Sequence, residues 1–231
     1  MAVITVSRQF GCGGEYVAEK VAEKLGFKLF HKELIKYIAI LTDTDEEKVN
    51  RFDEEQHSNF RSFMSDYFDA DLFSNVFKDE KINKVNDMIK NDETISFFDT
   101  YADQEPVFDS KRFSSMVELI IRNLATDTNC VIMGRGSQCI LEDEPNCLHI
   151  RLVAPFDDRV KWLTDKEELE AAKAAEQIKA IEKHKKSYIK HYYKRDIDDV
   201  SLYHSVFNLS KTSNDNLADM IIACAKSFLK F

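Results

Sequence analysis

The stretch at residues 2–25 constrains the fold of this chain more than any other. Residues 2–6 form a short apolar run rich in β-branched residues, which is typical of a buried strand. Gly11, Gly13 and Gly14 follow, and apolar residues then recur at helical spacing as far as Leu25, where Gly26 provides a stop signal. A strand, a glycine loop and a helix in this order place backbone amides beside a helix N-terminus, which favours phosphate binding.

The glycine loop departs from the pattern G-x-x-x-x-G-K-[ST], which binds nucleotide phosphates. With Gly13 as the second glycine, Arg8 stands at the first glycine, Gly14 at the lysine and Glu15 at the serine or threonine. Two interpretations stay open at this point. The loop either binds phosphate or is a tight turn that needs glycine for steric reasons alone.

Charge and cysteine content exclude several classes of protein. The 231-residue chain has a formal net charge of −9, which argues against general nucleic-acid binding, although a small phosphorylated ligand needs only a local cationic pocket. The five cysteines include no C-x-x-C pair, so we expect reduced thiols rather than disulfides or a zinc site. No signal peptide precedes Val3 and no apolar run approaches about 18 residues, which predicts a cytoplasmic protein without membrane contact.

Hydrophobic periodicity predicts an α/β fold with a five-stranded, mainly parallel sheet flanked by helices. Strands are expected at residues 2–6, 27–30, 130–133, 148–153 and 205–209. Helices are expected after the glycine loop, after Pro155, and at residues 31–41, 113–125, 166–194 and 217–228. Because parallel sheets bind ligands beyond the carboxyl ends of their strands, the glycine loop and Arg135 should meet at one edge.

We expect a single domain over residues 1–231, with a helical insertion at residues 42–112 and a lid with a basic helix at residues 164–196. The insertion is polar and acidic, with aromatic residues at mostly helical spacings. The lid contains the strongest cationic cluster of the chain: Lys183, Lys185, Lys186, Lys190, Lys194 and Arg195. This cluster is either a solvated helix face or an arm that closes over a triphosphate.

Arg135 follows directly from a predicted buried strand and lies between two glycines, which let a ligand approach the backbone. A guanidinium at this edge suits a phosphate or the edge of a base. The alternative is a structural arginine paired with a nearby carboxylate.

Five segments, in order, resemble the cytidylate kinase-like family of P-loop nucleotide kinases. They are VITVSRQFGCGGEYVAEKVAEKLG, LFHKELI, CVIMGRGSQCIL, LHIRLVAPFDDRV, and YYKRDIDD followed by YHSVFNLSKTS. The resemblance implies a P-loop kinase fold with a nucleoside-monophosphate-binding insertion and a lid. It also implies ATP and Mg²⁺ as cofactors, and transfer of the γ-phosphoryl group of ATP to a nucleoside monophosphate such as CMP.

The resemblance and the loop together suggest roles for individual residues. The expected ATP-binding residues are Gly11, Cys12, Gly13, Gly14, Glu15, Tyr16 and Arg159. The expected acceptor-binding residues are Lys32, Arg135, Lys190, Lys194, Arg195 and Asp196. Arg8, Arg135 and Arg195 are the candidates for catalytic positive charge, while no residue is assigned to magnesium.

The chain departs from cytidylate kinases at positions that matter for catalysis. Gly14 and Glu15 replace the loop lysine and the hydroxyl residue that binds magnesium. Met133 and Gly136 stand where aspartates that read cytosine flank the arginine. Two functions therefore stay open: an ATP-dependent phosphotransferase whose other cations replace the lysine, and a nucleotide-binding sensor or partner-binding protein with little or no turnover.

Overall fold

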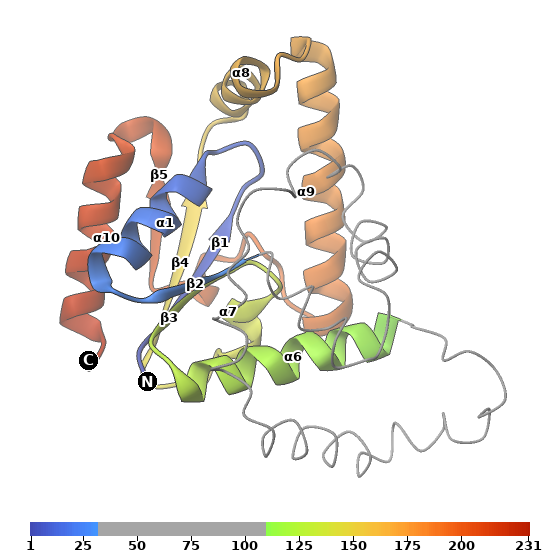
Figure 1. Ribbon diagram of the computed structural model, residues 1–231. Helices are drawn as coiled ribbons and strands as arrows, with labels where there is room; N and C mark the ends of the chain where they lie inside the picture. Colours follow the sequence, from blue (N-terminus) through green and yellow to red (C-terminus); the bar gives the residue numbers. More distant parts are fainter. Residues whose placement is uncertain (32–109) are drawn as a thin grey trace, which may run out of the picture. The chain divides into compact units, whose positions relative to one another are not determined.

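The computed structural model describes residues 1–31 and 110–231 (Figure 1). Residues 1–31 and 121–231 belong to one compact unit, and residues 110–120 belong to a second. The predicted helix at residues 31–41 and nearly all of the predicted insertion at residues 42–112 lie outside the described residues. Those predictions, and the role of Lys32, stay predictions.

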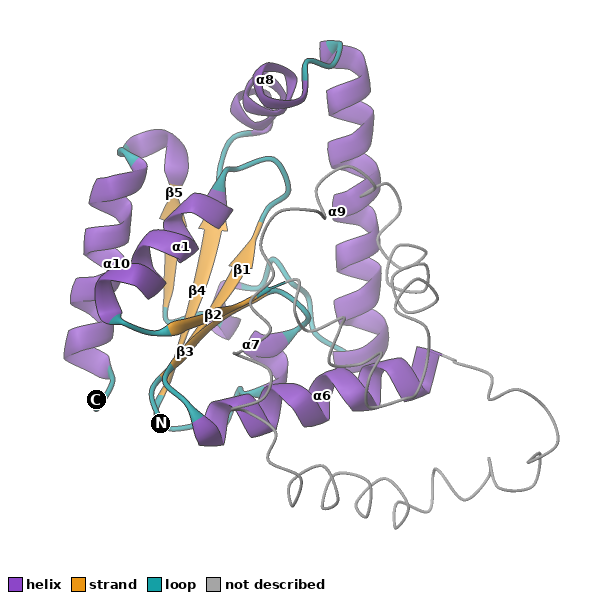
Figure 2. Ribbon diagram, in the orientation of Figure 1, coloured by secondary structure: helices purple, strands orange, loops and turns teal. Residues whose placement is uncertain are grey.

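A five-stranded sheet with the order β2-β3-β1-β4-β5 forms the centre of the larger unit (Figure 2). Its strands are β1 (Val3–Arg8), β2 (Lys28–Phe30), β3 (Cys130–Met133), β4 (Cys147–Val153) and β5 (Ser205–Asn208). Every neighbouring pair is parallel. The α/β class and the predicted strands are thus confirmed, and the carboxyl end of β1 lies in the middle of one sheet edge.

Helices of the larger unit cover the sheet, and they depart from the predicted pattern at residues 137–140, where no helix is expected, and at Glu168. They are α1 (Gly14–Leu25), α6 (Ser110–Asp127), α7 (Ser137–Ile140), α8 (Phe156–Glu167), α9 (Ala171–Tyr193) and α10 (Asn214–Phe228), with short 3-10 helices at Val200–Leu202 and Leu209–Lys211. The helix predicted as one run over residues 166–194 is divided. Glu168 ends α8 in a left-handed conformation with φ of 52°, and neither glycine nor proline marks this break in the sequence.

One face of the sheet carries the main apolar core. Alternate residues of the central strands point to this face, where α1 and α10 pack side by side (Figure 1). Buried members of this core include Ile4, Val6, Ile150, Leu152, Val17, Val21, Leu217 and Ile221. Since each such side chain contributes roughly 1.5–3 kcal/mol on burial, this layer fixes α1, and with it the glycine loop, against the sheet.

The opposite face of β1 and β4 is polar although it is buried. The strand register pairs Thr5 with His149 and Ser7 with Arg151. Thr5 Oγ1 lies 2.7 Å from His149 Nδ1, and Arg151 Nη1 donates a hydrogen bond to Ser7 Oγ at 2.7 Å. Burial, together with the nearby His204, lowers the pKa of His149 to about 4. This imidazole is therefore neutral at neutral pH.

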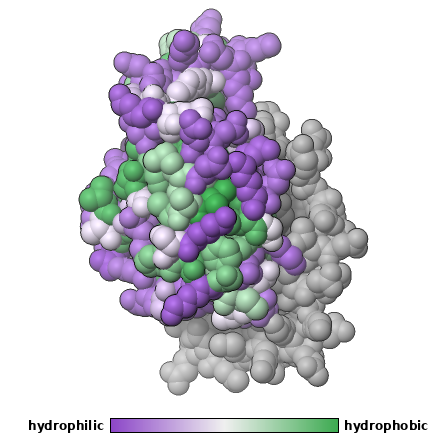
Figure 3. All heavy atoms as spheres, turned by 90° about the vertical axis from the view of Figure 1, so that its left-hand side faces the viewer, coloured by the Kyte–Doolittle hydropathy of each residue, from purple (hydrophilic) through white to green (hydrophobic). Residues whose placement is uncertain are grey.

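The outer face of α10 carries exposed apolar side chains, and Figure 3 shows apolar and polar residues interspersed on this side of the molecule. Met220 and Phe228 are 49% and 44% exposed. Single apolar side chains of this kind are common on soluble surfaces. Within the described ranges, no helix combines the length and the hydropathy that a bilayer crossing requires.

We predict that acid destabilises the fold through His149. The pKa of about 4 in the folded state lies below the ordinary value of 6.5, so the unfolded state binds more protons between these pH values. The contribution of the neutral imidazole is complete above pH 6.5 and is lost as the pH falls towards 4. The free energy of unfolding, measured by urea titration, should fall by about 2 kcal/mol between pH 7 and pH 5 on this account.

The control is His149→Gln, which retains polar groups but has no titrating ring. Its unfolding free energy should depend less steeply on pH over the same range. Parallel pH profiles for the two proteins would show that His149 does not cause the acid sensitivity.

Candidate functional site

The glycine loop joins the end of β1 to α1 and has a backbone that favours glycine. Gly11 and Gly13 have φ values of 79° and 74°, in the left-handed region. Gly13 is the N-cap of the twelve-residue helix α1, and no side chain caps this helix end. In residues 1–31 and 110–231, no group accepts a hydrogen bond from the amides of Gly11 or Gly13. Such a helix end is suited to an anion.

Gly14, at the lysine position of the loop pattern, is packed too closely for a side chain. A Cβ atom there would lie 2.9 Å from Leu152 Cδ1 and 3.3 Å from Arg8 Cδ. Leu152 is fully buried in the main core. A lysine at this position would therefore have to displace a core side chain.

Arg8 ends β1, and its guanidinium contacts the first turn of α1. Nη2 donates a hydrogen bond to Glu15 Oε1 at 2.7 Å, and Nε donates to Met133 Sδ at 3.2 Å. Lys166 Nζ also lies 3.8 Å from Glu15 Oε2. The Arg8 side chain is 12% exposed. Glu15 therefore pairs with Arg8 across the loop. A phosphate that binds Arg8 would have to share the guanidinium with Glu15 or replace this carboxylate.

Arg159 of α8, an expected ATP contact, is buried and bonds to backbone. Its Nε donates to the carbonyl of Ala154 and its Nη1 donates to the carbonyl of Phe10, each at 3.1 Å. The Phe10 ring packs with Leu163 and Ile178 in an apolar cluster between α8 and α9. These contacts favour a role for Arg159 in holding the loop rather than in touching ATP.

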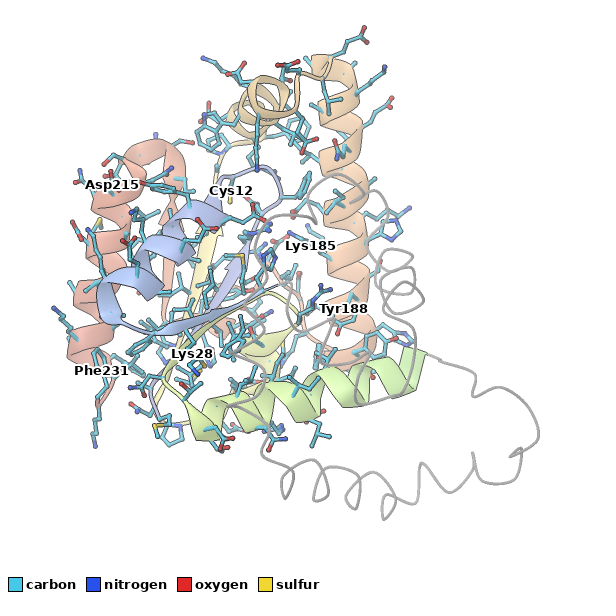
Figure 4. All side chains as sticks on the ribbon, in the orientation of Figure 1. Cys12, Lys28, Lys185, Tyr188, Asp215 and Phe231 are labelled. Carbon is cyan, nitrogen blue, oxygen red and sulfur yellow. The ribbon has the colours of Figure 1, made fainter. Side chains whose placement is uncertain are left out.

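Glu182 and Lys185 of α9 contact the same segment from another side. Glu182 accepts a hydrogen bond from the amide of Phe10 at 2.5 Å, and Lys185 Nζ donates to the carbonyl of Arg8 at 2.9 Å. Figure 4 shows Lys185 on the side of α9 that faces β1. Burial lowers the pKa of Lys185 to about 8. The sequence identified Lys185 only as one member of a cationic cluster.

A further charged group lies at the carboxyl end of β4. Arg151 Nη2 donates to Asp198 Oδ1 at 2.9 Å, and Lys186 Nζ lies 2.5 Å from Asp198 Oδ2. Burial alone would raise the pKa of Asp198, but Lys186 and Arg151 outweigh burial and lower it. Sequence reasoning missed Arg151, although the alternation of His149 and Arg151 with apolar residues signals a polar face of the strand.

Arg135 follows β3 in a loop whose backbone conformation is rare. Gly134, Arg135 and Gly136 have φ values of 77°, 58° and 72°. The ring of Tyr193, the last residue of α9, packs on Gly136, where a Cβ atom would lie only 2.4 Å from the ring. Holding a non-glycine residue in this region costs on the order of 1–3 kcal/mol. The fold thus imposes the conformation of Arg135, which is half-buried at the sheet edge that also carries Arg8.

Two other members of the predicted ATP-binding loop point away from it. Cys12 is 2% exposed, and burial raises the pKa of its thiol, so it is an unreactive part of the core. Tyr16 is exposed, and its hydroxyl donates to Asp215 of α10 at 3.1 Å. Figure 4 labels Cys12 at the start of α1 and Asp215 on α10.

The predicted acceptor-binding residues at the end of α9 are exposed: Lys190, Lys194, Arg195 and Asp196. Arg195 pairs with Glu142, which lies beyond α7. Lys194 ends α9 with φ of 56°, and its Nζ donates to a carbonyl of the preceding turn at 2.6 Å. Their roles in binding an acceptor stay predictions.

The acidic side chains at this edge do not fit a magnesium site held by the protein. In the part of the chain that the structure describes, no group of three or more His, Cys, Asp or Glu side chains could hold a metal ion. Glu15, Glu182 and Asp198 each lie in an ion pair with a basic side chain.

Comparisons with known proteins extend over nearly the whole chain. The cytidylate kinase-like family matches residues 3–211. A crystal structure of an uncharacterized protein from Eubacterium ventriosum ATCC 27560 matches with a TM-score of 0.62 and 21% identity, over 98% of this chain and 99% of that chain. No curated protein matches significantly.

Two further solved structures are more distant. Shikimate kinase from Acinetobacter baumannii has a TM-score of 0.49 at 11% identity, over 98% of this chain and 94% of that chain. Dephospho-CoA kinase from Campylobacter jejuni has a TM-score of 0.41 at 13% identity, over 97% of this chain and 98% of that chain. The family match covers residues 3–211, and the parallel sheet carries a glycine loop after its central strand. This chain therefore has a P-loop kinase fold and belongs to the cytidylate kinase-like family.

Proposed function

We propose that this protein is an ATP-dependent phosphotransferase that moves the γ-phosphoryl group to a nucleoside monophosphate, such as CMP, or to a related small phosphorylated acceptor. The observation that carries the proposal is the uncapped N-terminus of α1 behind the glycine loop, with Arg8 beside it. Membership in a kinase-like family supports the reaction class.

In this reaction the amides of the glycine loop bind the β-phosphate, and Arg8 and Arg135 neutralise charge on the phosphoryl groups. The bond between Pγ and the β–γ bridging oxygen breaks, a bond between Pγ and an acceptor phosphate oxygen forms, and ADP leaves. An acceptor that is already ionised needs no general base. Magnesium would supply further charge neutralisation with ATP, but the described residues do not form a site for it, and none is assigned to it.

A second function, nucleotide binding with little or no turnover, is favoured by two observations. Gly14 leaves no room for a lysine, and Glu15 pairs with Arg8 at 2.7 Å. A protein of this kind would bind ATP and release it unchanged. Acceptor-dependent formation of ADP separates the two functions.

We predict that millimolar ATP or ADP raises the Tm, because a ligand that binds only the folded state stabilises it by about 2.7 kcal/mol at a hundredfold excess over Kd. Adenosine is the control, because it lacks phosphates, and it should shift the Tm less. Absence of a shift with ATP and with ADP would contradict phosphate binding at the loop. If ATP binds, a panel of nucleoside monophosphates and other small acceptors then tests turnover. Binding of ATP without ADP formation, whichever acceptor is added, would favour the second function.

We predict that removing the Arg135 guanidinium weakens binding of the acceptor. Arg135→Gly is the appropriate variant, since glycine adopts the observed φ of 58° without strain. One charge-assisted contact is worth roughly 1.5–3 kcal/mol, so the KM for the acceptor should rise about tenfold or more. Binding of ATP and the Tm should change little. Early melting together with normal acceptor binding would instead identify Arg135 as structural.

We predict that Arg8→Ala reduces the single-turnover rate more than the affinity for ATP, because its charge matters most as the leaving group develops. Arg8→Lys should recover part of the rate, since bidentate contact is lost. Glu15→Gln is the matched control: it breaks the same ion pair but keeps the arginine, so it should retain the rate. Equal losses in Arg8→Ala and Glu15→Gln would show that the ion pair itself is what the site needs.

A further inference from the structure

We propose that Lys185 of α9 supplies the phosphate-binding ammonium that the glycine loop itself lacks, and that it contacts the β- and γ-phosphates of ATP. The inference rests on the proposed function, because it assigns a residue to the same site. In the usual loop pattern the positive charge belongs to a lysine of the loop itself. Here it would come from α9, a helix that packs against the segment entering the loop.

Lys185 lies beside the segment that enters the glycine loop. The carbonyl that receives its hydrogen bond belongs to Arg8, which stands at the first glycine position of the loop pattern. Arg8 also lies next to Gly14, which stands at the lysine position of the pattern, since a Cβ atom on Gly14 would lie 3.3 Å from Arg8 Cδ. The ammonium of Lys185 therefore contacts Arg8, the residue that neighbours position 14.

Lys185 differs from the next residue of the helix in its burial and in its partners. The Lys186 side chain is 54% exposed and pairs with Asp198, which raises its pKa. The Lys185 side chain is only 19% exposed and lies 3.5 Å from Glu182 Oε1, a carboxylate that also accepts the Phe10 amide. Surface lysines on a helix face are usually solvated, whereas burial of an ammonium is costly and calls for anionic partners.

The ammonium of Lys185 has more hydrogen-bond donors than its protein contacts use. An ammonium has three donors. Within the described parts of the chain, the Arg8 carbonyl takes one at 2.9 Å and Glu182 is the acidic group in reach of another. A third donor remains for a phosphate oxygen at the loop.

The charges that face Lys185 come from each element packed against it. Arg8 of β1 and Arg151 of β4 disfavour its charge, Glu182 on its own helix favours it, and Cys12 in the loop also favours it. Burial is the largest cause, and the net effect of burial and these charges lowers the pKa of Lys185 to about 8. A bound phosphate adds negative charge and raises this pKa, so nucleotide binding should be accompanied by proton uptake near pH 8.

The simpler alternative is that Lys185 and Glu182 only clamp the loop against α9. A clamp of this kind stabilises the fold but exchanges no proton with the solvent when a nucleotide binds. Proton uptake therefore separates the two roles.

The test is calorimetric titration of the whole chain with ADP at pH 8, in two buffers with different ionisation enthalpies. The wild-type protein should take up about half a proton per ADP, because a group with a pKa of about 8 is half neutral at that pH. Lys185→Arg, which is always charged, should take up none and still bind. Lys185→Met should bind ADP about tenfold more weakly or worse. Lys173→Met removes an exposed lysine from the same helix and should match the wild type.

The outcomes distinguish the inference from the proposed function. Unchanged ADP affinity in a folded Lys185→Met, or proton uptake that persists in Lys185→Arg, overturns the role of Lys185, while acceptor-dependent ADP formation would leave the phosphotransferase standing. Failure of the wild type to bind ADP overturns both. If Lys185→Met does not fold, the comparison of wild type with Lys185→Arg still decides the question.

Discussion

The hydrogen bonds between α9 and the backbone at Arg8 and Phe10 are the interactions on which the rest of the site depends. The glycine loop has little side-chain volume of its own, so its shape must be imposed from outside. Lys185 and Glu182 hold one carbonyl and one amide of the segment that enters the loop. Arg159 holds a second carbonyl from α8. The same helix thus fixes the loop and brings an ammonium to it, so loop geometry and site charge are coupled.

The two faces of the sheet contribute to the site in different ways. On one face, apolar packing of α1 and α10 against β1 and β4 positions the start of α1. On the other face, the polar pairs Thr5–His149 and Ser7–Arg151 are buried, and the second pair lies next to the edge where Arg8 ends β1. This division explains how a chain with a net charge of −9 can bring several basic side chains to one sheet edge. The net charge of the whole chain therefore does not reveal this local group of basic side chains.

The sequence predicted the strands, the glycine loop and the α/β class because these depend on local periodicity and on glycine spacing. It did not predict the contact between Lys185 and Arg8, which are 177 residues apart, because no local pattern carries information about such pairs. The break at Glu168 was missed because the residues around it have high helix propensity. The motif around Arg159 predicts a contact with ATP, which stays a prediction, whereas the hydrogen bonds of Arg159 to two carbonyls are visible only in the fold.

The central claim is that nucleotide phosphates bind to the amides at the start of α1. Hydrogen exchange of the amides of residues 11–15, measured with saturating ADP and with adenosine, tests it most directly. ADP should slow exchange at these amides by supplying hydrogen-bond acceptors, and adenosine should leave them unchanged. Protection by ADP that is confined to other parts of the chain would contradict the claim.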